Sequence, residues 1–65
     1  MRLTLNGKDR EVEGVGTVEE LIVSLGIHRM IVVQQNGTIL QREQYAASPL
    51  RDGDVLEIVH MVGGG

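Results

Sequence analysis

The sequence lacks several residue types whose chemistry would define a function. Its 65 residues include no cysteine, phenylalanine or tryptophan, and only one tyrosine and one proline. Without cysteine, disulfides, thiolate metal sites, iron–sulfur clusters and a cysteine nucleophile are excluded. Nucleic-acid binding is also disfavoured, because a net charge of −3 supplies no positive field and the chain has almost no aromatic rings for base stacking.

Long hydrophobic runs are missing as well. Met1 leads directly into alternating strand-like sequence, so we expect no signal peptide, no membrane span and a cytoplasmic protein. The hydrophobic content of 42% comes almost entirely from leucine, isoleucine and valine, which suffices for a folded core. A chain of this length predicts one small domain that is a monomer when free.

Candidate catalytic and ligand-binding residues are few. His28 and His60 have no partner at metal-ligand spacing, so a metal site is not expected. Ser24 falls within the predicted helix and Ser48 precedes a proline with no histidine nearby, which disfavours a nucleophilic triad. Gly14 and Gly16 lack the third glycine and the lysine of a phosphate-binding loop. We therefore expect no enzyme and no bound cofactor.

Local patterns in the first half predict two strands and a helix. Residues 1–6 alternate as a half-buried strand, Asn6-Gly7 predicts a type I′ hairpin, and residues 9–13 return as a second strand. Thr17 and Glu20 form a capping-box pattern, in which the Thr17 hydroxyl accepts from the amide of Glu20 and the Glu20 carboxylate reaches back to the amide of Thr17. The helix ends at a left-handed glycine, Gly26, and carries one apolar stripe, Val18, Leu21, Ile22 and Leu25.

The second half predicts three more strands. Residues 30–33 form a continuous apolar run, typical of an interior strand covered on both faces. A turn at Asn36-Gly37 precedes a short strand at 38–40, residues 41–47 are irregular or a helical turn, and a long final strand covers 54–62. This order is that of the β-grasp or ubiquitin-like fold, an α+β class with a mixed sheet of four to five strands packed on one helix.

The end of the chain offers the most specific signal. Gly63, Gly64 and Gly65 form a flexible tail after a single domain at 1–62, because glycine has maximal backbone freedom. Leu56 and Ile58 share the inward side of the last strand, since Glu57 is costly to bury. The outward side then presents apolar residues beside the tail, which predicts a partner-docking surface of Val59, Met61 and Val62.

Six segments, taken together and in order, cover most of the chain and carry a resemblance. They are Leu-Asn-Gly-Lys (5–8), Gly-Thr-Val-Glu-Glu-Leu (16–21), Asn36-Gly37 with Ile39-Leu40, Arg-Glu-Gln-Tyr (42–45), Asp-Gly-Asp (52–54) and Ile-Val-His-Met-Val-Gly-Gly-Gly (58–65). With these segments the chain resembles, over nearly its full length, the sulfur-carrier proteins of thiamine biosynthesis, the ThiS family. Gln41 departs from the proline that relatives often carry there.

This resemblance implies a chemical role for the carboxylate of Gly65. An E1-like, ThiF-like enzyme adenylates it with ATP and magnesium, a thiocarboxylate replaces the adenylate, and a ThiG-like thiazole synthase takes the sulfur. The Gly63-Gly64 segment threads into the partners, and a donor such as a cysteine desulfurase supplies the sulfur.

Three other roles are compatible with the same residues. The small subunit of molybdopterin synthase shares the fold and the terminal glycines, but it is usually longer and lacks the segment at 42–45. A protein modifier conjugated to lysines would share the activation chemistry. A binding module with a passive tail would not carry a thiocarboxylate.

Overall fold

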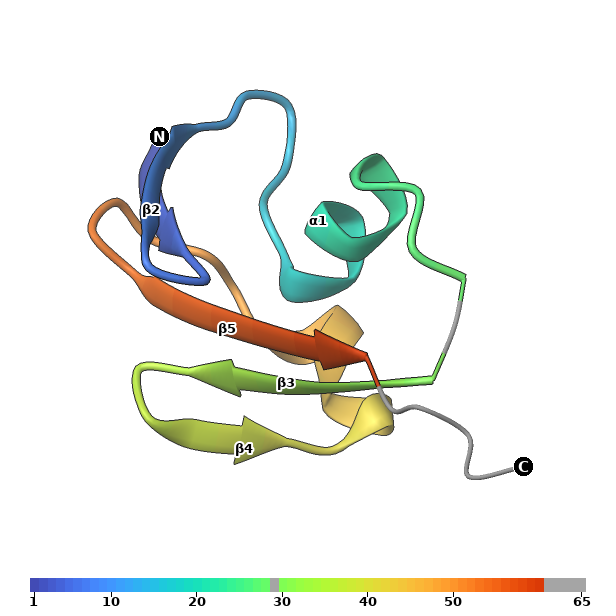
Figure 1. Cartoon of the computed structure of the whole chain (residues 1–65). Helices are drawn as coiled ribbons and strands as arrows, with labels where there is room; N and C mark the ends of the chain where they lie inside the picture. The colour runs from blue at the N-terminus through green and yellow to red at the C-terminus, as the bar shows by residue number, and fades with distance from the viewer. Residues whose placement is uncertain (29, 61–65) are drawn as a thin grey trace.

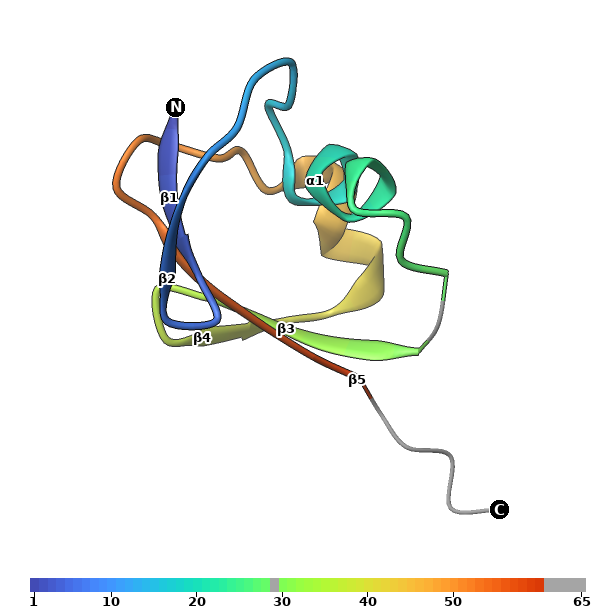
Figure 2. The same ribbon diagram turned by 45° about the horizontal axis from the view of Figure 1, so that its top comes forward.

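The computed structural model describes residues 1–28 and 30–60. In this part of the chain the strands form one five-stranded sheet in the order β2-β1-β5-β3-β4, and a helix crosses one of its faces (Figures 1 and 2). The pairing of β1 with β5 is parallel and the other three are antiparallel, so the predicted mixed sheet is confirmed. The elements are β1 (Arg2–Leu5), β2 (Lys8–Glu11), α1 (Val18–Ser24), β3 (Ile31–Gln35), β4 (Thr38–Leu40), the 3₁₀ helix η1 (Arg42–Ala47) and β5 (Val55–His60).

Both predicted Asn-Gly hairpins are present. Asn6 and Gly7 have φ angles of 50° and 82°, and Asn36 and Gly37 have φ angles of 52° and 83°. A type I′ turn requires a positive φ at both central residues, and asparagine followed by glycine tolerates this best. Each turn therefore joins two adjacent antiparallel strands, β1 to β2 and β3 to β4.

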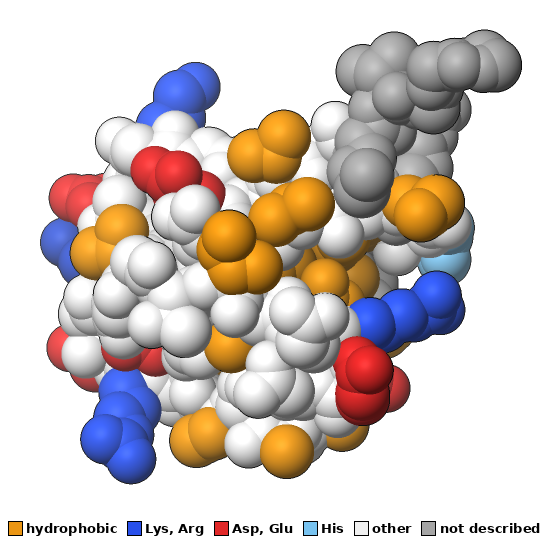
Figure 3. Space-filling model, turned by 90° about the horizontal axis from the view of Figure 1, so that it is seen from below, with side chains coloured by type: hydrophobic (Ala, Val, Ile, Leu, Met, Phe, Trp, Pro, Cys, Tyr) orange, Lys and Arg blue, Asp and Glu red, His pale blue; other side chains and the backbone are white. Residues whose placement is uncertain are grey.

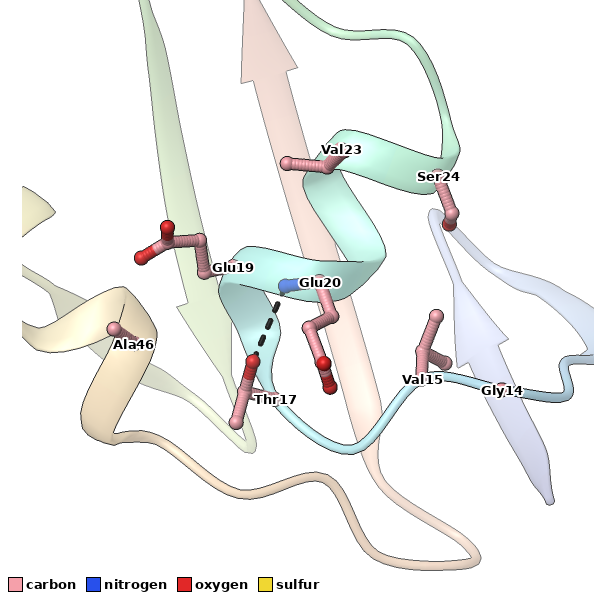
Figure 4. A pocket seen from close by; sticks show the side chains of 8 residues that line it. All are labelled: Gly14, Val15, Thr17, Glu19, Glu20, Val23, Ser24 and Ala46. Carbon is pink, nitrogen blue, oxygen red and sulfur yellow. Dashed lines mark hydrogen bonds between the residues drawn. The ribbon is translucent and has the colours of Figure 1, made fainter.

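The cap of α1 matches one half of its prediction. The Thr17 hydroxyl accepts a hydrogen bond from the amide of Glu20 at 3.1 Å (Figure 4). The predicted return bond is wrong in its donor, because the Glu20 carboxylate accepts from the amide of Gly16 at 2.7 Å, not from Thr17. Backbone bonds to the distant residues Ser48 and Leu50 hold the chain on both sides of Thr17. These tertiary contacts fix the path of the chain just before the helix. A capping-box pattern, which considers only neighbouring residues, does not include such contacts.

The core lies between α1 and the middle of the sheet. Val18 and Leu21 of the helix are fully buried, as the apolar stripe predicts. Strands β1, β3 and β5 all contribute to the same cluster, so the three central strands and the helix form one hydrophobic layer. The buried hydrophobic residues are Leu3, Leu5, Val18, Leu21, Ile22, Val33, Leu50, Leu56 and Ile58.

The strand predicted at 30–33 lies in the interior of the sheet, as expected. The prediction that it is covered on both faces is wrong. Val33 is fully buried, whereas Val32 is half-buried and Met30, before β3, is 72% exposed. In the described part of the chain α1 is the one α-helix, and it covers a single face. A short apolar run cannot distinguish a doubly covered strand from one with an open side.

Two strand boundaries also differ from the pattern. The second strand covers Lys8–Glu11 and not 9–13, and Val12 follows it as a half-buried residue packed against the core. β5 begins at Val55, so Asp54 precedes the strand. The predicted continuation through residues 61–62 lies outside the described residues, as does the tail at 63–65.

Candidate functional site

The two sides of β5 differ as the parity argument predicts. Leu56 is fully buried and Ile58 is 6% exposed, whereas Val59 is 58% exposed. Successive side chains of a strand point to opposite faces, so one side of β5 enters the core and the other faces the open side of the sheet. Of the predicted docking residues, Val59 is therefore confirmed as exposed.

Register adds three residues to this exposed side. Val32 of β3 pairs directly with Val59, and Ile39 of β4 pairs with Gln34, two residues along β3. Val55 lies on the same side of β5 as Val59, and Ile39 and Val55 are 56% and 45% exposed. We call Val32, Ile39, Val55 and Val59 the open-face patch.

The open-face patch is seen directly in Figure 3. Hydrophobic side chains gather over the middle of this face, and charged side chains lie mostly nearer its rim. Three of the six large hydrophobic residues that are exposed in the described part belong to it. Glu57 lies between Val55 and Val59 on the outward side of β5 and pairs with Gln34 of β3, so the patch also has polar groups within it. Exposed apolar side chains gathered on one face among polar groups are typical of a protein–protein contact.

The start of β5 is held by a buried carboxylate. Asp54 is only 8% exposed and accepts hydrogen bonds from the side chains of Gln35 and Asn36, both at 3.0 Å, and from the amide of Arg51 at 2.9 Å. Burial alone would raise the pKa of Asp54, but these three donors and the charge of Arg51 together lower it below its usual value. The carboxylate therefore stays ionised and ties the β3–β4 turn to β5.

The other predicted site residues, Met61, Val62, Gly63, Gly64 and Gly65, lie outside the described residues. Within residues 1–28 and 30–60, no group of three or more His, Cys, Asp or Glu side chains is arranged to hold a metal ion. No helix there is long and apolar enough to cross a membrane.

A hollow lies beside α1, away from the open-face patch. Figure 4 shows it between the helix, the loop before it and η1. Glu20 on its wall already binds the amide of Gly16, and the loop and helix residues around it build the N-terminal cap. Its lining includes Gly14, Val15, Thr17, Glu19, Glu20 and Ala46.

Sequence reasoning missed the contributions of Val32, Ile39 and Val55 to the patch. Val55 shares the outward parity of Val59, but the predicted docking surface does not include it. Val32 and Ile39 were hidden because their proximity to Val59 depends on the order of strands in the sheet. The available signal was the outward parity of each strand, combined with the β-grasp order.

A mixed sheet on one helix, with an apolar patch on the open face beside the last strand, defines a ubiquitin-like β-grasp protein. The ThiS family model matches residues 3–65. The chain belongs to the ThiS family, so the predicted family and fold are confirmed.

Individual relatives agree with this assignment. The sulfur carrier protein ThiS of Bacillus subtilis is 42% identical over 65 residues, covering 97% of this chain and 98% of the relative. The crystal structure of the thiamine biosynthesis protein ThiS from Geobacter metallireducens superimposes with a TM-score of 0.84 at 38% identity, covering both chains completely.

A longer kind of relative also matches. A thiazole synthase of Paramagnetospirillum magneticum is 41% identical over 66 residues, which cover the whole of this chain but 20% of that protein. The chain thus spans about a fifth of the length of this relative. A ThiS-like segment therefore occurs within a protein named as a thiazole synthase.

Proposed function

We propose that the chain is a sulfur carrier of thiamine biosynthesis and is itself a co-substrate, not an enzyme. The observation that carries the proposal is the family match over residues 3–65, together with full-length similarity to a protein named as a sulfur carrier. The match includes the terminal glycines, which are the part of the chain that the chemistry requires.

The proposed reactive group is the carboxylate of Gly65. A carboxylate has no good leaving group, so transfer of sulfur requires activation first. Attack of the carboxylate on the α-phosphate of ATP forms an acyl-adenylate and releases pyrophosphate. Sulfide displaces AMP directly and leaves a thiocarboxylate. A partner's persulfide displaces AMP to give an acyl disulfide, which a partner thiol then cleaves to the thiocarboxylate and a disulfide. Because the chain contains no cysteine, the sulfur comes from a partner, such as a cysteine desulfurase.

Two partner enzymes follow from this chemistry. An E1-like adenylyltransferase of the ThiF type supplies the ATP–magnesium site, and a thiazole synthase of the ThiG type accepts the sulfur. The occurrence of a ThiS-like segment within a named thiazole synthase supports the second partner, because a covalent link raises the effective concentration of two parts that act together.

The open-face patch is the proposed docking surface for these enzymes. Fixing the backbone of Gly63, Gly64 and Gly65 in a partner costs about 1–2 kcal/mol of conformational entropy for each residue. The folded body must offset that cost. Val59 lies two residues before Met61 and three before Val62 in the sequence, so apolar contacts at the patch are well placed to act together with the tail.

The direct test is intact-mass analysis after incubation with ATP, magnesium, a sulfur donor and the activating enzyme of the source cell. Exchange of one oxygen for sulfur in the C-terminal fragment is the expected result. Absence of any mass change, with an enzyme preparation shown to be active on another carrier, would contradict the proposal.

A truncated chain provides the matched control. Deleting Gly65 should abolish adenylation, because the reacting carboxylate then ends one residue short of its position. The truncated chain should keep the denaturant midpoint of the parent, since the buried core lies within residues 3–58. Pyrophosphate release at the parent's rate by this variant would show that Gly65 is not the reactive end.

A further inference from the structure

The side chain of Asn6 binds the last strand far from it in sequence. Its Oδ1 accepts from the backbone N–H of Ile58 at 2.8 Å, and its Nδ2 donates to the carbonyl of Ile58 at 3.2 Å. Both polar groups of the side chain are thus used on one residue. The Asn6–Ile58 clamp, as we call this pair of bonds, lies next to the exposed Val59.

The clamp continues the sheet where the backbone of β1 cannot. Regular pairing of β1 with β5 is seen in the bonds from the Thr4 amide to the Asp54 carbonyl and from the Asn6 amide to the Leu56 carbonyl, both 2.9 Å. The next rung would need a backbone acceptor and donor opposite Ile58. The chain instead turns away at Asn6, whose φ is 50°. A carboxamide carries the same acceptor and donor as a peptide group, so the Asn6 side chain supplies the missing rung.

The clamp also marks where β5 changes from two neighbours to one. Because strand groups alternate in direction, the N–H and C=O of Ile58 point toward β1 and those of Val59 point toward β3. Beyond the clamp, Val59 and His60 are paired only with Val32 and Ile31 of β3 among the described residues. Asn6 is therefore the last support on the β1 side before residues 61–65.

We propose that Asn6 is a positioning residue for the carrier terminus. It holds β5 extended through Ile58, and so keeps Val59 of the open-face patch in line with the end of the described strand at His60, after which the sequence continues to Gly65. This inference rests on the proposed function. A partner that binds both the patch and the terminus requires the two to be correctly oriented relative to each other. If the end of β5 were loosened, its conformational entropy would have to be lost on binding, which weakens productive binding.

Two substitutions remove the clamp in steps. Asn6→Gly deletes both bonds and keeps a residue that accepts a positive φ. Asn6→Asp keeps an acceptor for the Ile58 amide but loses the donor, and it sets a carboxylate oxygen against the Ile58 carbonyl. As a stability control, Thr17→Ala removes the helix cap, which lies on another element and does not contact β5 through any bond described here.

Amide hydrogen exchange measures the clamp itself. In Asn6→Gly we expect protection of the Ile58 amide to fall about tenfold, as for the loss of a net hydrogen bond, with a smaller fall in Asn6→Asp. The Val59 amide, which faces β3, should keep its protection. Unchanged protection of Ile58 in Asn6→Gly would overturn the proposal.

Pyrophosphate release by the activating enzyme measures the functional consequence. With the carrier as the varied substrate, kcat/KM should fall about tenfold for Asn6→Gly, less for Asn6→Asp, and not for Thr17→Ala at a matched shift of denaturant midpoint. Equal losses in Asn6→Gly and Thr17→Ala would reduce Asn6 to a structural role and overturn the inference. A parent chain that is not adenylated at all would overturn the proposed function and the positioning role with it, while hydrogen exchange would still report the clamp.

Discussion

The two faces of the sheet contain similar aliphatic side chains, but those on one face are buried in the core and those on the other are exposed. On the face beneath α1, Leu56 and Ile58 of β5 are almost inaccessible to solvent, whereas Val55 and Val59 of the same strand are 45% and 58% exposed on the other face. Hydrophobicity alone does not separate these two pairs. Their solvent exposure differs because α1 packs on one face of the sheet only.

This difference predicts where each kind of substitution acts. Removing a buried side chain leaves a cavity in a small core and costs folding free energy. Changing an exposed one leaves the core intact and alters only what a partner meets. Stability and partner binding should therefore respond to different residues of one strand.

The largest effect should come from the buried side. Leu56→Ala should lower the free energy of unfolding by about 2–5 kcal/mol, because Leu56 is completely enclosed. A domain this small has little stability in reserve, so the variant could unfold at room temperature. Urea denaturation followed by circular dichroism measures the loss. A midpoint equal to the parent's would contradict the assigned side of the strand.

The buried carboxylate should give the next largest effect. Asp54→Ala should cost about 1–3 kcal/mol, since the donors of Gln35, Asn36 and Arg51 then lose their acceptor. Denaturant midpoints of parent and variant at neutral pH measure this difference. Equal midpoints would show that the three bonds add nothing to stability.

Lowering the pH should reduce the difference in stability between the parent and Asp54→Ala. The pKa of Asp54 is lowered in the folded state, chiefly because hydrogen bonds from Asn36, Arg51 and Gln35 outweigh the effect of burial. The stabilisation is therefore complete above the unfolded-state value of about 3.9 and is lost as the pH falls through the lower folded value. Midpoints of parent and variant should converge on acidification, and a gap that persisted at the lowest pH would contradict this assignment.

On the open face the effect should move from stability to binding. Val59→Asp should weaken binding to the activating enzyme at least tenfold, about 1.4 kcal/mol, and should cost far less stability than Leu56→Ala, about 1 kcal/mol at most. Val23→Asp is the matched control, because Val23 is 67% exposed but lies on α1. Calorimetric titration compares the two. Similar losses from both variants would remove the special role of the patch. The corresponding prediction for Met61→Asp concerns a residue outside the described part of the chain.

The smallest effect should come from Val55→Thr. This substitution exchanges one methyl for a hydroxyl of similar shape. Loss of one buried methyl group is worth about 0.8 kcal/mol, so binding should weaken by about fourfold at most. Fluorescence anisotropy with a labelled carrier can resolve a change of this size. A loss as large as that of Val59→Asp would place the centre of the contact nearer the start of β5.

Much of the fold was predictable because its signals are local. A type I′ turn needs two successive residues that accept positive φ, so Asn6-Gly7 indicates a hairpin without any knowledge of the rest of the chain. Thr17 identifies the start of α1 through its own hydroxyl. The side of β5 that enters the core follows from the cost of burying Glu57.

Apart from the strand boundaries, the two errors involve contacts with segments outside the local pattern. The strand at 30–33 was predicted to be covered on both faces, but the position of α1 leaves Val32 on the open side. Glu20 was predicted to cap Thr17, but bonds to Ser48 and Leu50 present Gly16 instead. The first outcome depends on where α1 packs, and the second on bonds to Ser48 and Leu50; all of these lie outside the pattern that suggested each prediction.

The sequence by itself determined the family, the order of the elements, the two Asn-Gly turns and the inward side of β5, because each depends on neighbouring residues or on matched segments read in order. Only the tertiary structure decided that Val32 and Ile39 join Val59 in one patch, and that Asn6 supplies a rung of the sheet at Ile58, 52 residues away. The physical reason is strand register. The parallel pairing of β1 with β5 and the central place of β5 in the sheet bring together residues whose separation in sequence contains no local signal of contact.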